Sequence, residues 1–188
     1  FYTNGNGLTI NSTFSNPNGG TLRMNGDETL SLTMDTDSGI VDYAGTGSYT
    51  GLIGGNDYYD LKFSGTGGVW DLDSALTVSN NLDITAGTLD LAGQNITVTT
   101  SFDNLGTLRL QGGETTVSLT MDTDSGTVEY DGGGTYTSLL AGDEYYNLTI
   151  NSSTGDWTLD AGLTVNNDFA LTDGSFDIAA NDLAVGND

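Results

Sequence analysis

One repeated segment contains the residues whose type and spacing could do chemistry. The segment Asp35–Gly39, of sequence DTDSG, returns as Asp122–Gly126, so each copy places two carboxylates two residues apart before a glycine. Calcium takes several oxygen ligands from a flexible turn. The third acidic ligand of a D-x-D-x-D-G loop is missing, however, and the glycine comes one position early. Two interpretations stay open: a calcium site formed by Asp35, Asp37, Asp122 and Asp124, or bends built from turn-forming Asp and Ser.

Composition limits the remaining chemistry. The chain has no cysteine and no histidine, which excludes thiol and imidazole nucleophiles, disulfides and zinc sites that depend on these residues. Three basic residues against 26 acidic ones give a net charge of −23, which repels nucleic acid and anionic lipid headgroups. No apolar run approaches the roughly 18 residues of a membrane span. We therefore expect neither nucleic acid binding nor membrane insertion.

The chain is a tandem repeat. The sequence MDTDSG begins at Met34 and again at Met121, an offset of 121 − 34 = 87 residues, and Trp70 returns as Trp157. The repeats run approximately over 20–105 and 106–188, and 1–19 form a preceding turn. Because the copies follow each other without a linker, we expect one domain over 1–188.

A finer period lies inside each repeat, where a glycine precedes the alternation x-Φ-x-Φ and Φ is apolar. It occurs at Gly20, Gly39, Gly68, Gly87, Gly106, Gly126, Gly155 and Gly174, with spacings of 19, 29, 19, 19, 20, 29 and 19 residues. Nine further apolar pairs have the same alternation: Leu8/Ile10, Leu30/Leu32, Leu61/Phe63, Leu76/Val78, Ile96/Val98, Val117/Leu119, Leu148/Ile150, Leu163/Val165 and Leu183/Val185. This period-two pattern between turn residues predicts short strands.

Strands this short bury an apolar face only when they stack. When the chain coils, each strand of a turn stacks on the equivalent strand of the previous turn. This arrangement gives parallel ladders, one core and right-handed connections. The sequence thus predicts an all-β fold, a right-handed parallel β-helix (β-solenoid) of about nine turns of roughly 19–20 residues, on the order of 40 Å long. A β-sandwich or barrel is the alternative, but the near-equal glycine spacing favours the solenoid.

The signatures Gly87–Leu91 and Ile96–Val98 resemble the repeats of filamentous-haemagglutinin-like adhesins, autotransporter stalks and giant bacterial surface proteins. The resemblance covers the whole chain and rests on repeat length and these two patterns rather than on a catalytic motif. It implies a secreted or cell-surface location and a structural or adhesive role.

The fold predicts columns of outward side chains. The first strand of each turn gives the column Arg23, Asp42, Asp71, Asp90, Arg109, Glu129, Thr158 and Asp177. We expect Arg109 to lie between Asp90 and Glu129, and Arg23 to lie beside Asp42, so that these charges pair across adjacent turns. Asp71 beside Asp90 is a like-charge contact that costs stability unless water or a cation screens it. These two aspartates are a second candidate calcium site, and an ordinary solvated ladder is the alternative.

The second strand predicts a face rich in hydroxyl groups. Its outward column is Thr9, Ser31, Lys62, Thr77, Thr97, Ser118, Thr149 and Thr164. Such a face could bind ice or a glycan, although Lys62 interrupts it and threonine is in any case a good exposed strand residue.

The two 29-residue intervals look like insertions, at Ala44–Asp57 and Asp131–Glu144. We expect them to protrude from the same side of the solenoid, four turns apart. Their aromatic and apolar residues are Tyr49, Leu52, Tyr136 and Leu139. These residues either cover the flank of the solenoid or form a bivalent contact surface for another chain or a glycan.

An enzyme is not expected, and neither is a cofactor other than calcium. Paired aspartates can act as acid and base, but a catalytic cleft is a single irregular place and this chain repeats its features in both halves. End turns of a solenoid carry unpaired strand edges. We therefore predict a structural module of an extracellular filament, sheath or adhesin stalk that stacks head to tail with itself or belongs to a longer tandem array. A glycan-binding or ice-binding module is the rival function.

Overall fold

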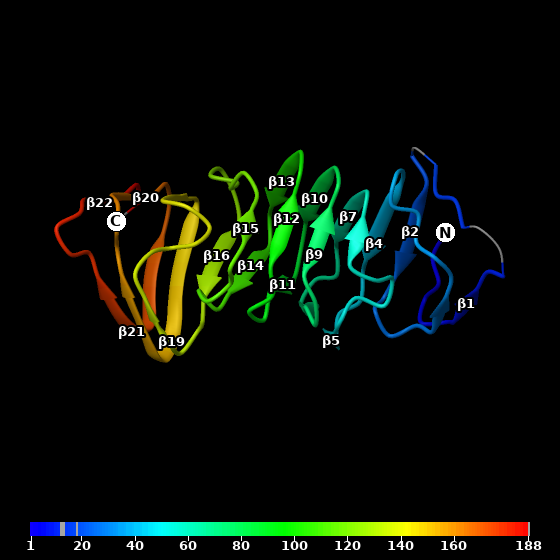
Figure 1. Cartoon of the computed structure of the whole chain (residues 1–188), viewed down its shortest axis with the longest axis horizontal. Coiled ribbons are helices and arrows are strands. Elements are labelled where there is room, and N and C mark those ends of the chain that lie inside the picture. The colour runs from blue at the N-terminus through cyan, green and yellow to red at the C-terminus, as the bar shows by residue number, and fades with distance from the viewer. Residues whose placement is uncertain (12–13, 18, 188) are drawn as a thin grey trace.

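The chain folds as a rod of stacked β-strands (Figure 1). The computed structural model describes residues 1–11, 14–17 and 19–187. In this part of the chain every regular element is a strand and every strand pair is parallel. The two ends of the chain lie at opposite ends of the rod. The predicted all-β parallel solenoid of about nine turns is confirmed.

Three strands per turn give the rod three sides. Side 1 contains β2 (Thr21–Met24), β4 (Ile40–Tyr43), β7 (Asp60–Phe63), β10 (Asn81–Ile84) and β13 (Ser101–Asn104). Side 2 contains β5 (Ser48–Thr50), β8 (Val69–Asp71), β11 (Thr88–Asp90), β14 (Thr107–Leu110), β16 (Thr127–Tyr130) and the first parts of β19 (Asn147–Thr158) and β21 (Phe169–Asp177). Side 3 contains β6 (Asp57–Tyr58), β9 (Leu76–Val78), β12 (Ile96–Val98) and β15 (Val117–Ser118).

The remaining strands continue these sides toward the two ends. β17 (Thr135–Tyr136) follows β16 round the next corner and pairs with the last part of β19. β18 (Glu144–Tyr145), β20 (Leu163–Val165) and β22 (Leu183–Val185) form a further ladder. It prolongs side 1, because Asn104 N donates to Asp122 Oδ2 at 2.8 Å and Asn166 Nδ2 donates to the Thr123 carbonyl at 2.8 Å. β1 (Leu8–Thr9) pairs with β3 (Leu30–Ser31) near the N-terminal end.

The predicted apolar alternation builds the core. Along β10, Leu82 and Ile84 are fully buried while their neighbours face outward. Leu82 lies between Leu61 and Phe102 of the adjacent turns. Each such side chain contributes about 1.5–3 kcal/mol of hydrophobic stabilisation, and it does so only because the turns above and below cover it.

The predicted insertions are wrong. Tyr49 pairs with Trp70 and Tyr58 pairs with Val78, so Ala44–Asp57 supplies ordinary strands of sides 2 and 3 instead of protruding. Asp131–Glu144 also supplies ordinary strands, one side further on, since Tyr136 pairs with Trp157 and Glu144 pairs with Thr164. A 29-residue interval is one turn of about 20 residues plus one more side. The spacing of the glycines alone does not distinguish two cases. Either a loop is inserted, or the glycine pattern x-Φ-x-Φ recurs one side later in the turn.

As a consequence, the second repeat is turned by one side relative to the first. β4 lies on side 1, where Asp42 pairs with Lys62. Its copy 87 residues later, β16, lies on side 2, where Glu129 pairs with Arg109. Each repeat therefore carries the chain through four turns and one additional side.

Candidate functional site

The DTDSG corners use their first aspartate to hold the turn. Asp35 accepts hydrogen bonds from Asn16 N (2.7 Å), Asp37 N (3.2 Å) and Ser38 Oγ (3.1 Å). The bond from Asn16 is the main reason why the pKa of Asp35 is lowered to about 2. The charged carboxylate thus ties the corner to the previous turn.

The second corner repeats this arrangement. Asp122 accepts hydrogen bonds from Asn104 N, Asp124 N and Ser125 Oγ at 2.8–3.0 Å. Partial burial raises the pKa of Asp122, but these bonds outweigh it and the pKa is lowered. Asp37 and Asp124 are exposed. Within residues 1–11, 14–17 and 19–187 no three acidic groups gather closely enough to hold a metal, and calcium binding at the corners stays a prediction.

The predicted charged column is real but shorter than expected. Asp71, Asp90, Arg109 and Glu129 do lie in successive strands of side 2. Asp42 does not precede Asp71, however, because it pairs with Lys62 on side 1, and Glu129 is followed by Thr149. The change of side in each 29-residue interval divides the column.

The like-charge contact between Asp71 and Asp90 is present, as their strands place them side by side. Partial burial and the charge of Asp90 raise the pKa of Asp71, against the attraction of Arg109. Arg109 Nη1 lies 3.3 Å from Asp90 Oδ2, so the arginine already neutralises part of this pair.

Arg109 is the centre of a network, the Arg109 cluster, formed with Asp90, Glu129 and Asp131. Arg109 Nε lies 3.5 Å from Glu129 Oε1 and 3.8 Å from Asp131 Oδ2. Burial, followed by repulsion from Asp90, raises the pKa of Asp131 to about 6 despite the arginine. Sequence reasoning missed Asp131, although the alternation that points Glu129 outward also favours an outward residue two positions later.

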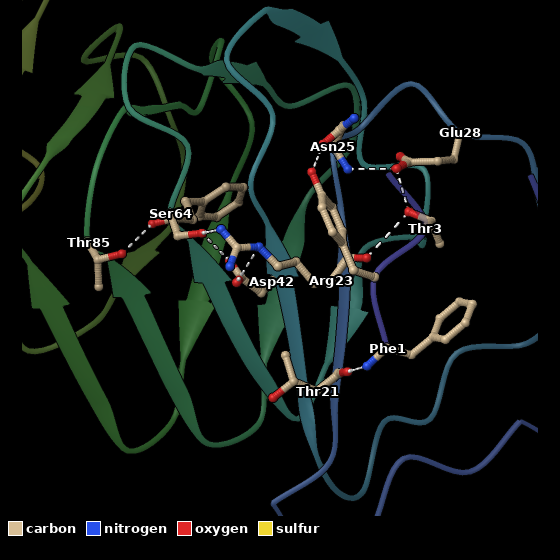
Figure 2. Close-up of polar contacts among 11 residues, drawn as sticks. Phe1, Thr3, Thr21, Arg23, Asn25, Glu28, Asp42, Ser64 and Thr85 are labelled. Atoms are coloured by element: carbon tan, nitrogen blue, oxygen red, sulfur yellow. Dashed lines mark hydrogen bonds and ion pairs between the residues drawn. The ribbon is translucent and has the colours of Figure 1, made fainter. Parts of the chain in front are cut away.

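Arg23 forms a smaller network on side 1 (Figure 2). Its Nε lies 3.5 Å from Asp42 Oδ2, and Nη2 donates to Ser64 Oγ at 3.4 Å. Ser64 in turn donates to Asp42 Oδ1 at 2.6 Å. The guanidinium carbon also lies 5.5 Å from the centre of the Tyr2 ring. Arg23 therefore joins consecutive turns, as predicted for its pairing with Asp42.

Each repeat contains a buried glutamate that was not predicted from the sequence. Glu28 accepts hydrogen bonds from Thr3 Oγ1 at 2.5 Å and from Asn25 N at 2.8 Å (Figure 2). It also accepts from the backbone N atoms of Gly5 and Gly26, at 3.0 and 2.8 Å. Burial raises its pKa, but the bonds outweigh burial and lower the pKa to about 2. The available signal was its recurrence as Glu114, which accepts from Gln111 N and Gly112 N.

The predicted hydroxyl-rich face is divided among ladders. The largest group that shares one ladder is Thr77, Thr97 and Ser118, on side 3. Thr9 pairs with Ser31 near the N-terminal end, Lys62 lies between Asp42 and Asp83, Thr149 follows Glu129, and Thr164 pairs with Glu144 and Ala184. The change of side again separates residues that the sequence aligns.

The residues proposed for contacts pack against the solenoid. Leu52 and Leu139 are buried, with 6% and 5% of their surface exposed. Tyr49 stacks on Trp70 with ring centres 5.7 Å apart, and Tyr136 stacks on Trp157 at 5.2 Å. The two leucines thus belong to the core, and each tyrosine covers a tryptophan.

Both ends of the rod carry uncovered apolar residues. In the last turn Leu171 is 48% and Ile178 is 41% exposed, whereas Ile84 and Leu91, their counterparts 87 residues earlier, are fully buried. The first turn has a cavity of about 410 Å³ whose lining includes Phe1, Leu8, Ile10, Phe14 and Leu22. The apolar core therefore reaches the surface at each end.

Comparison with protein-family models, curated proteins and solved structures gives no match. In the part of the chain that the structure describes, no helix is long and apolar enough to cross a membrane.

Proposed function

We propose that the chain is a structural module of an extracellular filament, sheath or adhesin stalk, of the kind suggested by its resemblance to filamentous-haemagglutinin-like and autotransporter repeats. The observation that carries this proposal is the contrast between positions in the last turn and their buried counterparts. Leu171 and Ile178 are exposed, while Ile84 and Leu91 are covered by the next turn. One additional turn, from a second copy or a further repeat, would cover them in the same way.

Strand direction and charge favour head-to-tail stacking. Among the described residues every pair of neighbouring strands is parallel, so only a copy in the same orientation continues the ladders. From Asp160 to Asp188 the chain has six aspartates and no basic residue. Residues 1–30 instead contain one basic residue, Arg23, and two acidic ones, Asp27 and Glu28. Two acidic C-terminal ends of the rod repel each other, which opposes tail-to-tail contacts.

The decisive variants lie on one strand, β21. Leu171 stacks on the buried Ile150, whereas its neighbour Ala170 pairs with Thr149 on the outward face. We expect Leu171→Glu to reduce self-association at least tenfold, because a charge then enters the apolar contact. Ala170→Glu adds the same charge and should leave association unchanged. The measurement is sedimentation velocity over a range of concentrations, with circular dichroism to confirm folding.

A wild-type protein that stays a 19.5 kDa monomer at every concentration would contradict end-to-end assembly. Equal association of the two variants would do the same. The rival function, binding of glycan or ice, has its own tests in a glycan array and in thermal hysteresis, and only three members of the expected hydroxyl column remain together on side 3.

A further inference from the structure

Four asparagines of the sequence are followed directly by glycine: Asn4, Asn6, Asn18 and Asn25. At an Asn–Gly step the main chain reacts readily with the asparagine side chain, because glycine has no β-carbon to shield its nitrogen or to restrict its backbone. Asn18 lies outside the residues that the structure describes. The other three steps have different surroundings, and these surroundings decide which of them can react.

The reaction is a cyclisation followed by hydrolysis. The glycine N–H loses its proton to hydroxide, and the nitrogen forms a bond to Cγ of the asparagine. The bond between Cγ and Nδ2 breaks, and Nδ2 leaves as ammonia after taking a proton from water, which restores the hydroxide. Water then opens the succinimide at either carbonyl carbon and leaves aspartate or isoaspartate. The reaction therefore requires only water and a glycine N–H whose proton can be removed.

Glu28 binds the glycine nitrogens of two of these steps. Its Oε1 accepts a hydrogen bond from Gly5 N at 3.0 Å, and its Oε2 accepts one from Gly26 N at 2.8 Å. Glu28 is buried, and its pKa is lowered to about 2, so it is charged at neutral pH. A negative charge at this distance opposes the loss of either N–H proton. Each hydrogen bond must also break before the nitrogen can attack.

The step between Asn6 and Gly7 has no such protection. Among the residues with described positions, none accepts a hydrogen bond from Gly7 N. Both residues are exposed. The side-chain amide of Asn6 donates to the carbonyls of Thr3 and Asn4 at 3.0 and 3.3 Å, and at an exposed residue such bonds exchange for bonds to water at small net cost. Hydroxide can therefore reach the Gly7 N–H, and the Asn6 side chain can turn toward it.

We propose that Asn6 is a site of spontaneous deamidation in the folded protein, and that the carboxylate of Glu28 protects Asn4 and Asn25 from the same reaction. The product carries a new carboxylate. In its isoaspartyl form the main chain also gains one carbon, two residues before Leu8, where β1 begins. The change therefore falls at the entrance to the ladder of β1 and β3. The site does not depend on the end-to-end assembly proposed above.

The second repeat has the same buried carboxylate without the reactive step. Glu114 accepts hydrogen bonds from Gln111 N and Gly112 N at 2.7 and 2.8 Å, and Gln111 stands where the first repeat has Asn25. Glutamine must close a larger ring than asparagine and reacts more slowly. Glu114 is therefore a matched control for Glu28, because its removal disturbs an equivalent corner and uncovers no Asn–Gly step.

The test compares wild-type protein aged in the folded state with protein aged in guanidinium chloride, at the same mildly alkaline pH. Trypsin cuts after Arg23 and Lys62, so Asn4 and Asn6 lie on one peptide and Asn25 on the next. Electron-transfer fragmentation then locates aspartate and isoaspartate at each position. In the unfolded chain the three steps should react at similar rates. In the folded protein we expect Asn6 to react at least about tenfold faster than the other two, because their hydrogen bonds to a charged group must break first.

Equal rates at the three steps of the folded protein would overturn the proposal, and so would an Asn6 that reacts as slowly as Asn25. The role of Glu28 is tested by Glu28→Gln, with circular dichroism to confirm folding; the wild-type comparison stands without it. This variant should speed the reaction at Asn4 and Asn25 about tenfold, while Glu114→Gln should leave both rates unchanged. Unchanged rates in folded Glu28→Gln, or equal acceleration by the two variants, would contradict protection by Glu28.

Discussion

At the scale of single residues, two carboxylates with different surroundings have opposite effects on the stability of the fold. Glu28 receives several hydrogen bonds from backbone N–H groups and the Thr3 hydroxyl, which stabilise its charged form. Asp131 is partly buried next to Asp90 and Glu129 and shares one arginine with them. The charge of Glu28 therefore supports the fold, while the charge of Asp131 opposes it.

Asp131→Asn should stabilise the protein in a defined pH window. The pKa of Asp131 is raised from 3.8 to about 6 in the folded state, so the folded protein binds the proton more tightly than the unfolded chain does. Its stability falls as the pH rises from about 4 to 6, and the full cost remains above pH 6. We expect the variant to raise Tm by about 2–4 °C at pH 7.5, the shift that 1 kcal/mol gives at this chain length, and by nothing at pH 3.

Glu28→Gln is the control with the opposite sign. The pKa of Glu28 is lowered from 4.5 to about 2, so its contribution is present above pH 4.5 and is lost as the pH falls toward 2. This variant should lower Tm at pH 7.5 and approach wild type near pH 2. A lower Tm for Asp131→Asn at pH 7.5 would show that its ion pair with Arg109 outweighs the cost of burial.

At the scale of structural elements, the corners depend on close contact between turns. Gly126 has a φ of +67°, and a β-carbon there would collide with the backbone carbonyl of Asn104 in the turn below. Gly67 has a similar φ of +78°, but a β-carbon there would meet no atom within 4 Å. These two glycines separate the cost of backbone conformation from the cost of the contact.

Gly126→Ala should therefore destabilise the protein more than Gly67→Ala. A left-handed backbone costs a residue with a β-carbon about 1–2 kcal/mol, which is the whole effect expected at Gly67. At Gly126 the collision must also separate two turns, and we expect a loss of about 3 kcal/mol or more. Urea unfolding measures both values. Equal losses would mean that the turns are not in contact at this corner.

The sequence predicts the strands well and their assignment to sides poorly. The alternation of apolar and polar residues places Leu82 and Ile84 in the core. Successive side chains of a strand point to opposite faces, so a pattern with a period of two residues buries one face. The side of a strand depends instead on the number of residues that the corners consume. The interval between Gly39 and Gly68 is equally consistent with a loop or with one more side, and only the pairing of Tyr49 with Trp70 decides between them.

The candidate sites could be predicted from the sequence only where their residues stay on one side of the rod. The contacts of Arg109 with Asp90 and Glu129 were expected because they lie within one run of 19-residue and 20-residue intervals. The hydroxyl column failed because it crosses both long intervals. Glu28 was missed because its recurrence as Glu114 does not by itself distinguish a buried acid that binds backbone N–H groups from an exposed one.

At the scale of the whole molecule, the described residues form a rod whose core runs from turn to turn. In such a solenoid each turn is stabilised mainly by its neighbours, so an end turn lacks half of its contacts. The exposure of Leu171 and Ile178 is the measurable result. This exposure is why we propose that the ends of the rod are the sites of assembly.

Electron microscopy of the wild-type protein over a range of concentrations shows whether the rods assemble end to end. We expect unbranched filaments, one rod wide, that lengthen as the concentration rises and, when aligned, diffract at a spacing of about 4.8 Å along their axis. Isolated particles about 40 Å long, the length of nine stacked turns, at every concentration would contradict end-to-end assembly.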